Sequence, residues 1–351
     1  MMSDTSNPQF RHGTMTWDGR ELADDNQWMQ ELNAEELRLI ANAVASTKAS
    51  GKPIELLTRD DYAFGAFGDR LLQWQDDLMN GHGFVVLRGL AELGADDKDL
   101  VRAYWGMGLW LGQAVSQNAS AHLLGHVIDK RAPASADTRI YQTSKAQPFH
   151  SDSCDIVGLL CLRQARHGGA SAIASSAAIH NAMLEHDAAA LRTLYGSFHC
   201  DRYGEIPEGA QPWYQISIFS DVDNKLVCVG MDPDIRSAQR LDGVESLSEA
   251  QQYALDSFQQ TANTLALNME LQRGDVQLLN NLAVVHARTA YEDFDDPALR
   301  RYMVRLWLSS PQGRRLPEFL AARWGSIEPG SVRGGITVKG ATPSVHLDPG
   351  T

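Results

Sequence analysis

Three side chains of this sequence have the types and spacing of a non-haem metal site. His150 and Asp152 stand two residues apart in FHSD, just before the apolar run IVGLLCL. On an extended segment, side chains two apart project from the same face, so this imidazole and this carboxylate can bind one ion. We assign the second imidazole to His286. Two imidazoles and one carboxylate form the face that suits iron(II) and leaves coordination positions open.

Two other His-x-Asp pairs show that the triplet alone is weak evidence. His199/Asp201 follows a predicted helix and leads into what we expect to be a loop without a strand behind it. His346/Asp348 lies in a tail rich in glycine and proline, with no histidine after it. We therefore place the metal at the first pair.

Two arginines follow His286 in the predicted strand RYMVRLWL. Arg301, Met303 and Arg305 share one face of such a strand. A guanidinium binds a carboxylate bidentately, so the pair suits a dicarboxylic co-substrate that chelates the metal through a 2-oxo acid end. The alternative is an exposed strand face with surface arginines.

The elements that must position these residues are mostly short strands. Strands are predicted at 83–89, 156–162, 213–219, 225–229, 275–279 and 302–308. Helices are predicted after the capping box Asn33-Ala34-Glu35-Glu36 up to Gly51, and over 62–79, 176–194 and 248–269. This pattern favours a mainly β fold, a sandwich or barrel core braced by helices.

We expect one integrated domain with three parts. Residues 1–80 form an arm and helices that pack on the core, 81–310 the core with helical insertions, and 311–351 a loop-rich tail. The cysteines form no CxxC pair and are interpreted as reduced thiols. Cys154, two residues beyond Asp152, could face the metal cavity.

Composition favours small-molecule chemistry. The sequence has 31 Lys and Arg against 44 Asp and Glu, a net charge of −13, which opposes nonspecific binding to nucleic acid or anionic lipid. We see no secretion signal and no apolar run long enough for a membrane span, so we expect a cytoplasmic protein. The sequence leaves the possibility of a homo-oligomer open.

Three segments together resemble one enzyme superfamily. GFVVLRGL at 83–90, the turn His167-Gly168-Gly169-Ala170-Ser171 and GDVQLLNNLAVVHART around His286 are similar to the taurine dioxygenase and clavaminate synthase-like oxygenases. The likeness covers about residues 80–310. These enzymes depend on iron(II) and 2-oxoglutarate.

The resemblance implies a double-stranded β-helix, or jelly-roll, core. It implies iron(II) on His150, Asp152 and His286, with 2-oxoglutarate held by Arg301 and Ser171. The implied reaction oxidises, most simply hydroxylates, a small molecule with O2, and converts 2-oxoglutarate to succinate and CO2. Asp152 argues against a halogenase, because related halogenases lack a carboxylate there.

The candidate substrate contacts are Arg305, which by the resemblance lies near the substrate, and Tyr141, Thr143 and Gln147 on the approach to His150. Each of the last three has an alternative interpretation as a loop residue bonded to its own backbone. Ala146 occupies a position that contacts substrate in taurine dioxygenase, which makes taurine itself doubtful.

Two other function classes remain open. One is a jelly-roll protein that binds zinc or a ligand at the same triad, or a metal-dependent hydrolase, neither of which would need Arg301 and Ser171. The other is a nucleotide site built on Gly106, Gly108 and Gly112. Their spacing is not GxGxxG, and the neighbouring tryptophans indicate a packed helix or turn.

Overall fold

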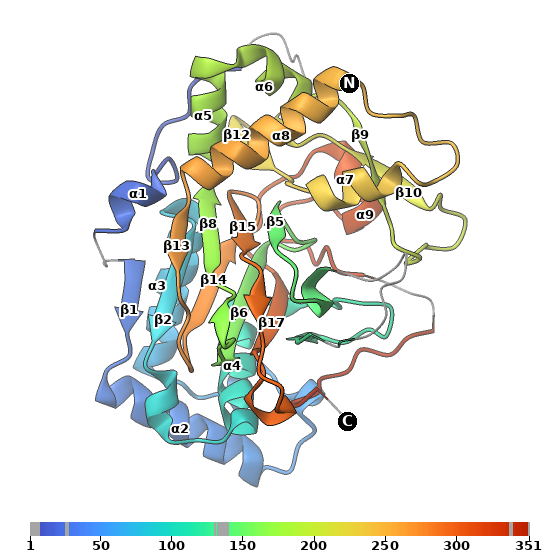
Figure 1. Ribbon diagram of the computed structural model, residues 1–351. Helices are drawn as coiled ribbons and strands as arrows, with labels where there is room; N and C mark the ends of the chain where they lie inside the picture. Colours follow the sequence, from blue (N-terminus) through green and yellow to red (C-terminus); the bar gives the residue numbers. More distant parts are fainter. Residues whose placement is uncertain (1–7, 25–27, 130, 132–139, 337–339, 350–351) are drawn as a thin grey trace.

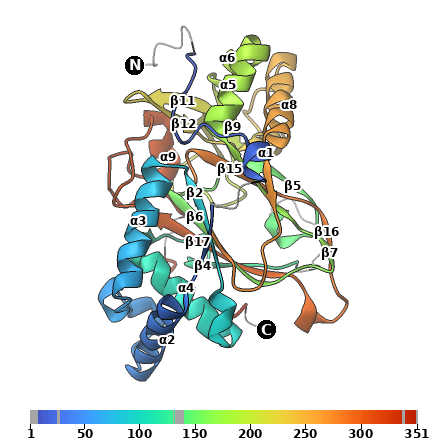
Figure 2. The same cartoon turned by 90° about the vertical axis from the view of Figure 1, so that its left-hand side faces the viewer.

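Two β-sheets face each other at the centre of the molecule, and helices cover them from outside (Figures 1 and 2). The structure, a computed structural model, describes residues 8–24, 28–129, 131, 140–336 and 340–349.

The larger sheet has the strand order β1-β2-β14-β6-β17-β3, and β4 also pairs with β17. Its strands are β1 (Met29–Glu31), β2 (Phe84–Arg88), β3 (Gln113–Ala114), β4 (Leu124–Val127), β6 (Ile156–Arg163), β14 (Val276–Asn280) and β17 (Tyr302–Ser309). The smaller sheet has the order β13-β8-β15-β5. Its strands are β5 (Gln147–His150), β8 (Ser171–Ser175), β13 (Leu267–Met269) and β15 (Val284–Arg288).

The larger sheet is buried on both faces. On β2, Phe84 and Val86 belong to the apolar core that also contains Ile173 of the smaller sheet. Val85 and Leu87 belong to the core beneath the covering helices. Burial on both sides explains why these strands are continuous apolar runs rather than alternating ones.

Helices cover both sheets, and they contain more residues than the strands do. On the larger sheet lie α3 (Ala66–Asn80) and α4 (Asp97–Leu111), and α2 (Ala34–Ala49) packs against these two helices. On the smaller sheet lie α5 (Ser176–His186) and α8 (Glu249–Thr264) (Figure 2). Helix makes up 35% and strand 23%, so the fold is a mixed one that contains more helix than the expected mainly β chain.

Smaller elements complete the architecture. They are α1 (Gly19–Leu22), α6 (Ala188–Leu194), α7 (Asp232–Ala238), α9 (Ala321–Trp324), and the strand pairs β7 (His167–Gly168) with β16 (Tyr291–Glu292), β9 (Phe198–Asp201) with β10 (Trp213–Ile216), and β11 (Phe219–Val222) with β12 (Lys225–Cys228). Within the described part of the chain, no helix is both long and apolar enough to cross a bilayer.

Two predicted helices were too long. The one over 176–194 is divided at Asp187, whose backbone is not helical (φ −152°, ψ 65°) and whose carboxylate caps α6 by accepting from the Ala190 N–H. The capping-box residue Ser248 begins α8, but the helix ends at Thr264. The last three residues of that prediction form β13, because there they pair with β8.

Two other predicted elements each included residues that do not belong to the same element in the structure. Gly65, at φ +55°, precedes α3, so this helix begins at Ala66 and leaves Tyr62 in the core outside it. The predicted strand 213–219 is split between β10 and β11, which pair with different partners.

The glycines considered for a nucleotide site lie in or at the end of α4, where two of them allow close packing. A Cβ at Gly106 would lie 2.3 Å from the Tyr62 ring, and one at Gly108 would lie 2.3 Å from Leu306. These contacts explain both residues without a ligand.

Candidate metal centre

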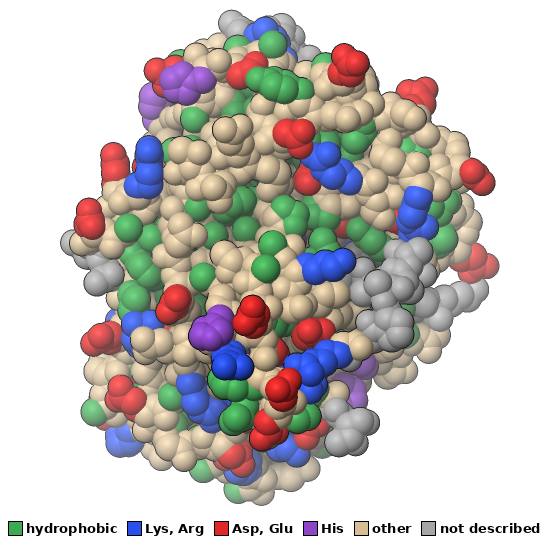
Figure 3. Space-filling view, viewed as in Figure 1, with side chains coloured by type: hydrophobic (Ala, Val, Ile, Leu, Met, Phe, Trp, Pro, Cys, Tyr) green, Lys and Arg blue, Asp and Glu red, His purple; other side chains and the backbone are tan. Residues whose placement is uncertain are grey.

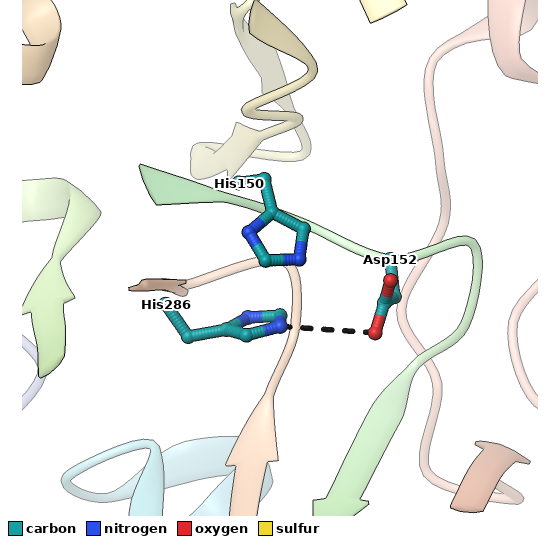
Figure 4. Close-up of side chains that lie close together, drawn as sticks. All are labelled: His150, Asp152 and His286. Atoms are coloured by element: carbon teal, nitrogen blue, oxygen red, sulfur yellow. Dashed lines mark ion pairs between the residues drawn. The ribbon is translucent and has the colours of Figure 1, made fainter. Parts of the chain in front are cut away.

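The three predicted metal ligands come together at the end of the smaller sheet (Figure 4). His150 of β5 and His286 of β15 are direct partners across the two antiparallel strands, and Asp152 follows in the loop to β6. Their ligand atoms lie within 4.8 Å of one another. His286 Nε2 is 3.7 Å from Asp152 Oδ2. Among the described residues, this is the one cluster with the geometry of a metal site.

Burial keeps both imidazoles in the form that binds metals. It lowers the pKa of His150 and, aided by the neighbouring His150, lowers the pKa of His286 to about 3. His150 Nδ1 lies 3.0 Å from the Pro148 carbonyl oxygen, which can only accept, so Nδ1 carries the proton and Nε2 presents its lone pair. Gln147 Nε2 lies 2.8 Å from that lone pair.

Asp152 is held as a carboxylate by its neighbours. Burial acts to raise its pKa, but the Arg305 guanidinium holds the pKa below its ordinary value. Trp307 Nε1 donates to Oδ2 over 2.8 Å, and Arg305 Nη1 lies 3.3 Å from Oδ1. Neutral imidazoles and an ionised carboxylate, all largely buried, therefore fit a divalent metal ion.

The loop that carries Asp152 is fastened by a fully buried amide. Asn281 accepts from the Asp152 N–H over 2.8 Å and donates to the carbonyls of Asp152 and Cys154. Each buried backbone group of the loop that it contacts is thereby paired. The loop conformation that points Asp152 at the imidazoles is set by a residue next to β14.

Two cavities adjoin the triad. The first is lined by His150, Asp152, Trp307 and Arg305, and by residues of the later chain including Tyr203, Glu205, Asp234, Arg323 and Ile336. The second is lined by His150, His286, Ser171, Gln277, Arg288, Arg301 and Arg305.

The second cavity unites the two residues predicted for a dicarboxylic co-substrate. Ser171 begins β8, and Arg301, 2% exposed, immediately precedes β17. Arg301 Nη1 is buried and has no hydrogen-bond partner among the described residues. A Cβ at Gly169 would lie 3.0 Å from Arg301 Nε, so the Gly-Gly turn leaves room for this guanidinium.

Three of the four predicted substrate contacts line both cavities: Tyr141, Gln147 and Arg305. Arg305 also donates from Nε to Gln117 over 2.8 Å, and its guanidinium packs 4.9 Å from the Tyr141 ring. Thr143 differs, because its hydroxyl donates to the Ile140 carbonyl, as a loop residue bonded to its own backbone would.

The other His-x-Asp pairs are engaged elsewhere. His199 lies on strand β9 and packs against Trp213, while Asp201 pairs with Arg240. Asp348 pairs with Lys98.

All four cysteines are free and buried, as expected. Cys154 packs into the core between the sheets rather than facing the cavity.

Sequence reasoning missed Trp307, Asn281 and Arg288. Trp307 lies two residues beyond Arg305 on a predicted strand, so the same alternation rule could have placed it on the site-facing side. Arg288 is related to His286 in the same way. Asn281 had a weaker signal, an amide pair inside an otherwise apolar segment.

Comparison with known proteins gives a family match over most of the chain. Residues 50–307 match the model described as Taurine catabolism dioxygenase TauD, TfdA family. The chain is 31% identical to FR-33289 synthase of Streptomyces rubellomurinus, covering 89% of this chain and 94% of that protein. It is 25% identical to a taurine hydroxylase-like protein of Stachybotrys chartarum, covering 83% and 78%.

Solved structures share the fold. An asparagine oxygenase in complex with Fe(II), hydroxyasparagine and succinate superposes with a TM-score of 0.63 at 17% identity, over 81% of this chain and 95% of that one. The non-heme iron oxygenase OrfP with Fe and alpha-ketoglutaric acid gives 0.56 at 16%, over 80% and 94%.

Proposed function

The chain belongs to the TauD, TfdA family of dioxygenases, and from that premise we propose the reaction and the roles of its residues. It is an Fe(II)/2-oxoglutarate-dependent oxygenase. We propose that it hydroxylates a small molecule while 2-oxoglutarate is converted to succinate and CO2. The supporting observation is that one cavity joins two members of the triad, His150 and His286, to Ser171 and to the buried Arg301, whose Nη1 has no hydrogen-bond partner among the described residues. We also infer that the two facing sheets form a double-stranded β-helix core.

In this proposal His150, Asp152 and His286 hold the iron. When bound, iron and 2-oxoglutarate supply the oxidising chemistry from O2. The chain supplies position and environment. Trp307 and Arg305 orient the Asp152 carboxylate, and the Pro148 carbonyl fixes the tautomer of His150.

The two cavities take different molecules. Arg301 and Ser171 would bind the far carboxylate of 2-oxoglutarate in the second cavity, because a buried guanidinium needs an anion. The first cavity would hold the substrate, with Tyr141, Gln147 and Arg305 at the boundary between the two. Its wall carries both acidic and basic side chains, which suits a polar substrate.

The test is to add iron(II) and 2-oxoglutarate without oxygen and then admit oxygen. We expect a weak visible charge-transfer band in the anaerobic mixture, followed by oxygen-dependent release of succinate. His150→Ala should abolish both, because it removes one metal ligand. If the native protein gives neither signal and behaves like His150→Ala, the proposal fails.

A further inference from the structure

A second buried arginine, Arg288, lies beside the cavity that Arg301 lines. It ends β15, two residues after His286, and is the cross-strand partner of Ser171 on β8. Its side chain is 7% exposed. Arg288, Ser171 and Arg301 all line the second cavity.

Both guanidiniums pack on the same tyrosine ring. The Cζ atoms of Arg288 and Arg301 lie 4.8 Å and 5.2 Å from the ring centroid of Tyr291 on β16. Both guanidinium groups are cations at neutral pH. Two cations thus share one buried region.

Neither cation has an anionic partner among the residues that the structure describes. Within the described ranges, neither Arg288 nor Arg301 has a carboxylate oxygen within 4 Å. In the part of the chain that the structure describes, Arg288 Nε and Nη1, Arg301 Nη1 and the Tyr291 hydroxyl are buried and have no hydrogen-bond partner. Leaving charged donors buried and unpaired is costly, so a cluster of them in a cavity wall indicates a site for an anionic ligand.

We infer that Arg288, together with Arg301, binds the far carboxylate of the dicarboxylic co-substrate. This inference rests on the proposed function and adds a residue to it. The remaining nitrogen of Arg288, Nη2, donates to the carbonyls of Thr143 (3.0 Å) and Lys145. Arg288 therefore links the co-substrate cavity to the segment that carries Tyr141 and Gln147 into the substrate cavity.

The alternative is that Arg288 only supports that segment. The two roles differ in what they require of the ligand. A carboxylate-binding Arg288 matters for 2-oxoglutarate but not for 2-oxopentanoate, which has the same carbon chain and lacks the far carboxylate. A purely supporting Arg288 affects both acids equally.

The experiment measures the dissociation constants of both acids by calorimetry on anaerobic, iron(II)-loaded protein. Arg288→Met should weaken 2-oxoglutarate by about 10- to 100-fold, the effect of losing a charge-assisted hydrogen bond, and change 2-oxopentanoate by less than about twofold. Arg288→Lys should retain part of the preference for 2-oxoglutarate. Arg301→Met serves as the positive control and Arg192→Met, on the exposed side of α6, as the negative one.

Each result decides the inference. An unchanged ratio of the two constants in Arg288→Met overturns it, whether both affinities fall or neither does. Because the ratio is measured within one folded population, partial misfolding does not mimic the expected result. If wild-type protein binds neither acid, the proposed function fails and this inference fails with it. If wild-type binds 2-oxoglutarate and Arg288→Met keeps its preference, only this inference fails.

Discussion

Asp152 is the most constrained of the proposed ligands at the scale of single residues. Its carboxylate accepts hydrogen bonds from Trp307 and Arg305, which both lie on β17. Its backbone N–H donates to the side chain of Asn281. Such outer contacts orient a ligand and adjust its basicity, so they contribute to metal affinity without touching the metal.

The variant Trp307→Phe tests whether the hydrogen bond from Trp307 to Asp152 contributes to metal affinity. It removes the hydrogen bond to Asp152 while keeping an aromatic ring, so iron(II) affinity should fall by about 10- to 100-fold in a metal titration. Trp105→Phe is the matched control, because the Trp105 N–H is also buried but has no partner. Equal iron affinity in the two variants would contradict a role for the Trp307 hydrogen bond.

At this scale, sequence indicated the residues that act through local spacing. His150 and Asp152 stand two apart, and Arg301 and Arg305 recur along one strand. Trp307 contributes through a contact with a residue 155 positions away. This contact with Asp152 depends on which strands lie side by side in the fold, and a local sequence pattern does not indicate that pairing.

At the scale of elements, the segment that follows β17 contributes directly to the site. It returns to the loop of Asp152, where Arg333 pairs with Asp155 at 2.6 Å, both side chains fully buried. The Gly335 N–H donates to the Ser153 carbonyl over 2.7 Å. Ile336 then lines the first cavity. The last part of the chain thus builds one wall of the site.

Arg333→Met should therefore be strongly destabilising. It leaves the Asp155 carboxylate buried without its cation, which costs about 3–5 kcal/mol in the free energy of unfolding. Urea denaturation measures this. Arg315→Met, which breaks an exposed pair with Glu328 in the same segment, should cost less than about 1 kcal/mol. Comparable losses in the two variants would show that burial of the pair is unimportant.

The element predictions were accurate where one signal dominates. The Asn33 capping box begins α2 as expected, and the doubly buried strands β2, β6, β14 and β17 are apolar runs. They were wrong where tertiary pairing divides a continuous pattern. Leu267–Met269 continues a helical periodicity but pairs with β8, and that pairing is not visible locally.

For the molecule as a whole, buried histidines set the response to acid. His180 of α5 is fully buried, and burial followed by the charge of Arg11 lowers its pKa from 6.5 to about 4. Since its pKa is lower folded than unfolded, its stabilising effect is complete above pH 6.5 and is lost as pH falls towards 4.

We expect His180→Gln to reduce the acid sensitivity of stability. Between about pH 7.5 and about pH 5, wild type should lose about 2 kcal/mol more in the free energy of unfolding than the variant does. His186→Gln, exposed at the end of the same helix, should behave like wild type. Parallel pH profiles for wild type and His180→Gln would refute the prediction.

The surface agrees with the overall composition. Acidic and basic side chains are interspersed on the face shown in Figure 3, most densely over the end that carries α2 and α4. Composition anticipated such a mixed, net acidic exterior. The arrangement of two sheets around the triad could not follow from composition, because it depends on pairings between distant strands such as β2 with β14.

The buried pair of Asp155 with Arg333 also orders events during synthesis. A ribosome delivers residues 150–155 long before residue 333, so the nascent chain contains the proposed metal ligands while their supporting loop still lacks its cation. A domain generally folds as a unit during synthesis. The loop reaches its final form only after the returning segment has emerged, which makes completion of the metal centre one of the last steps in maturation.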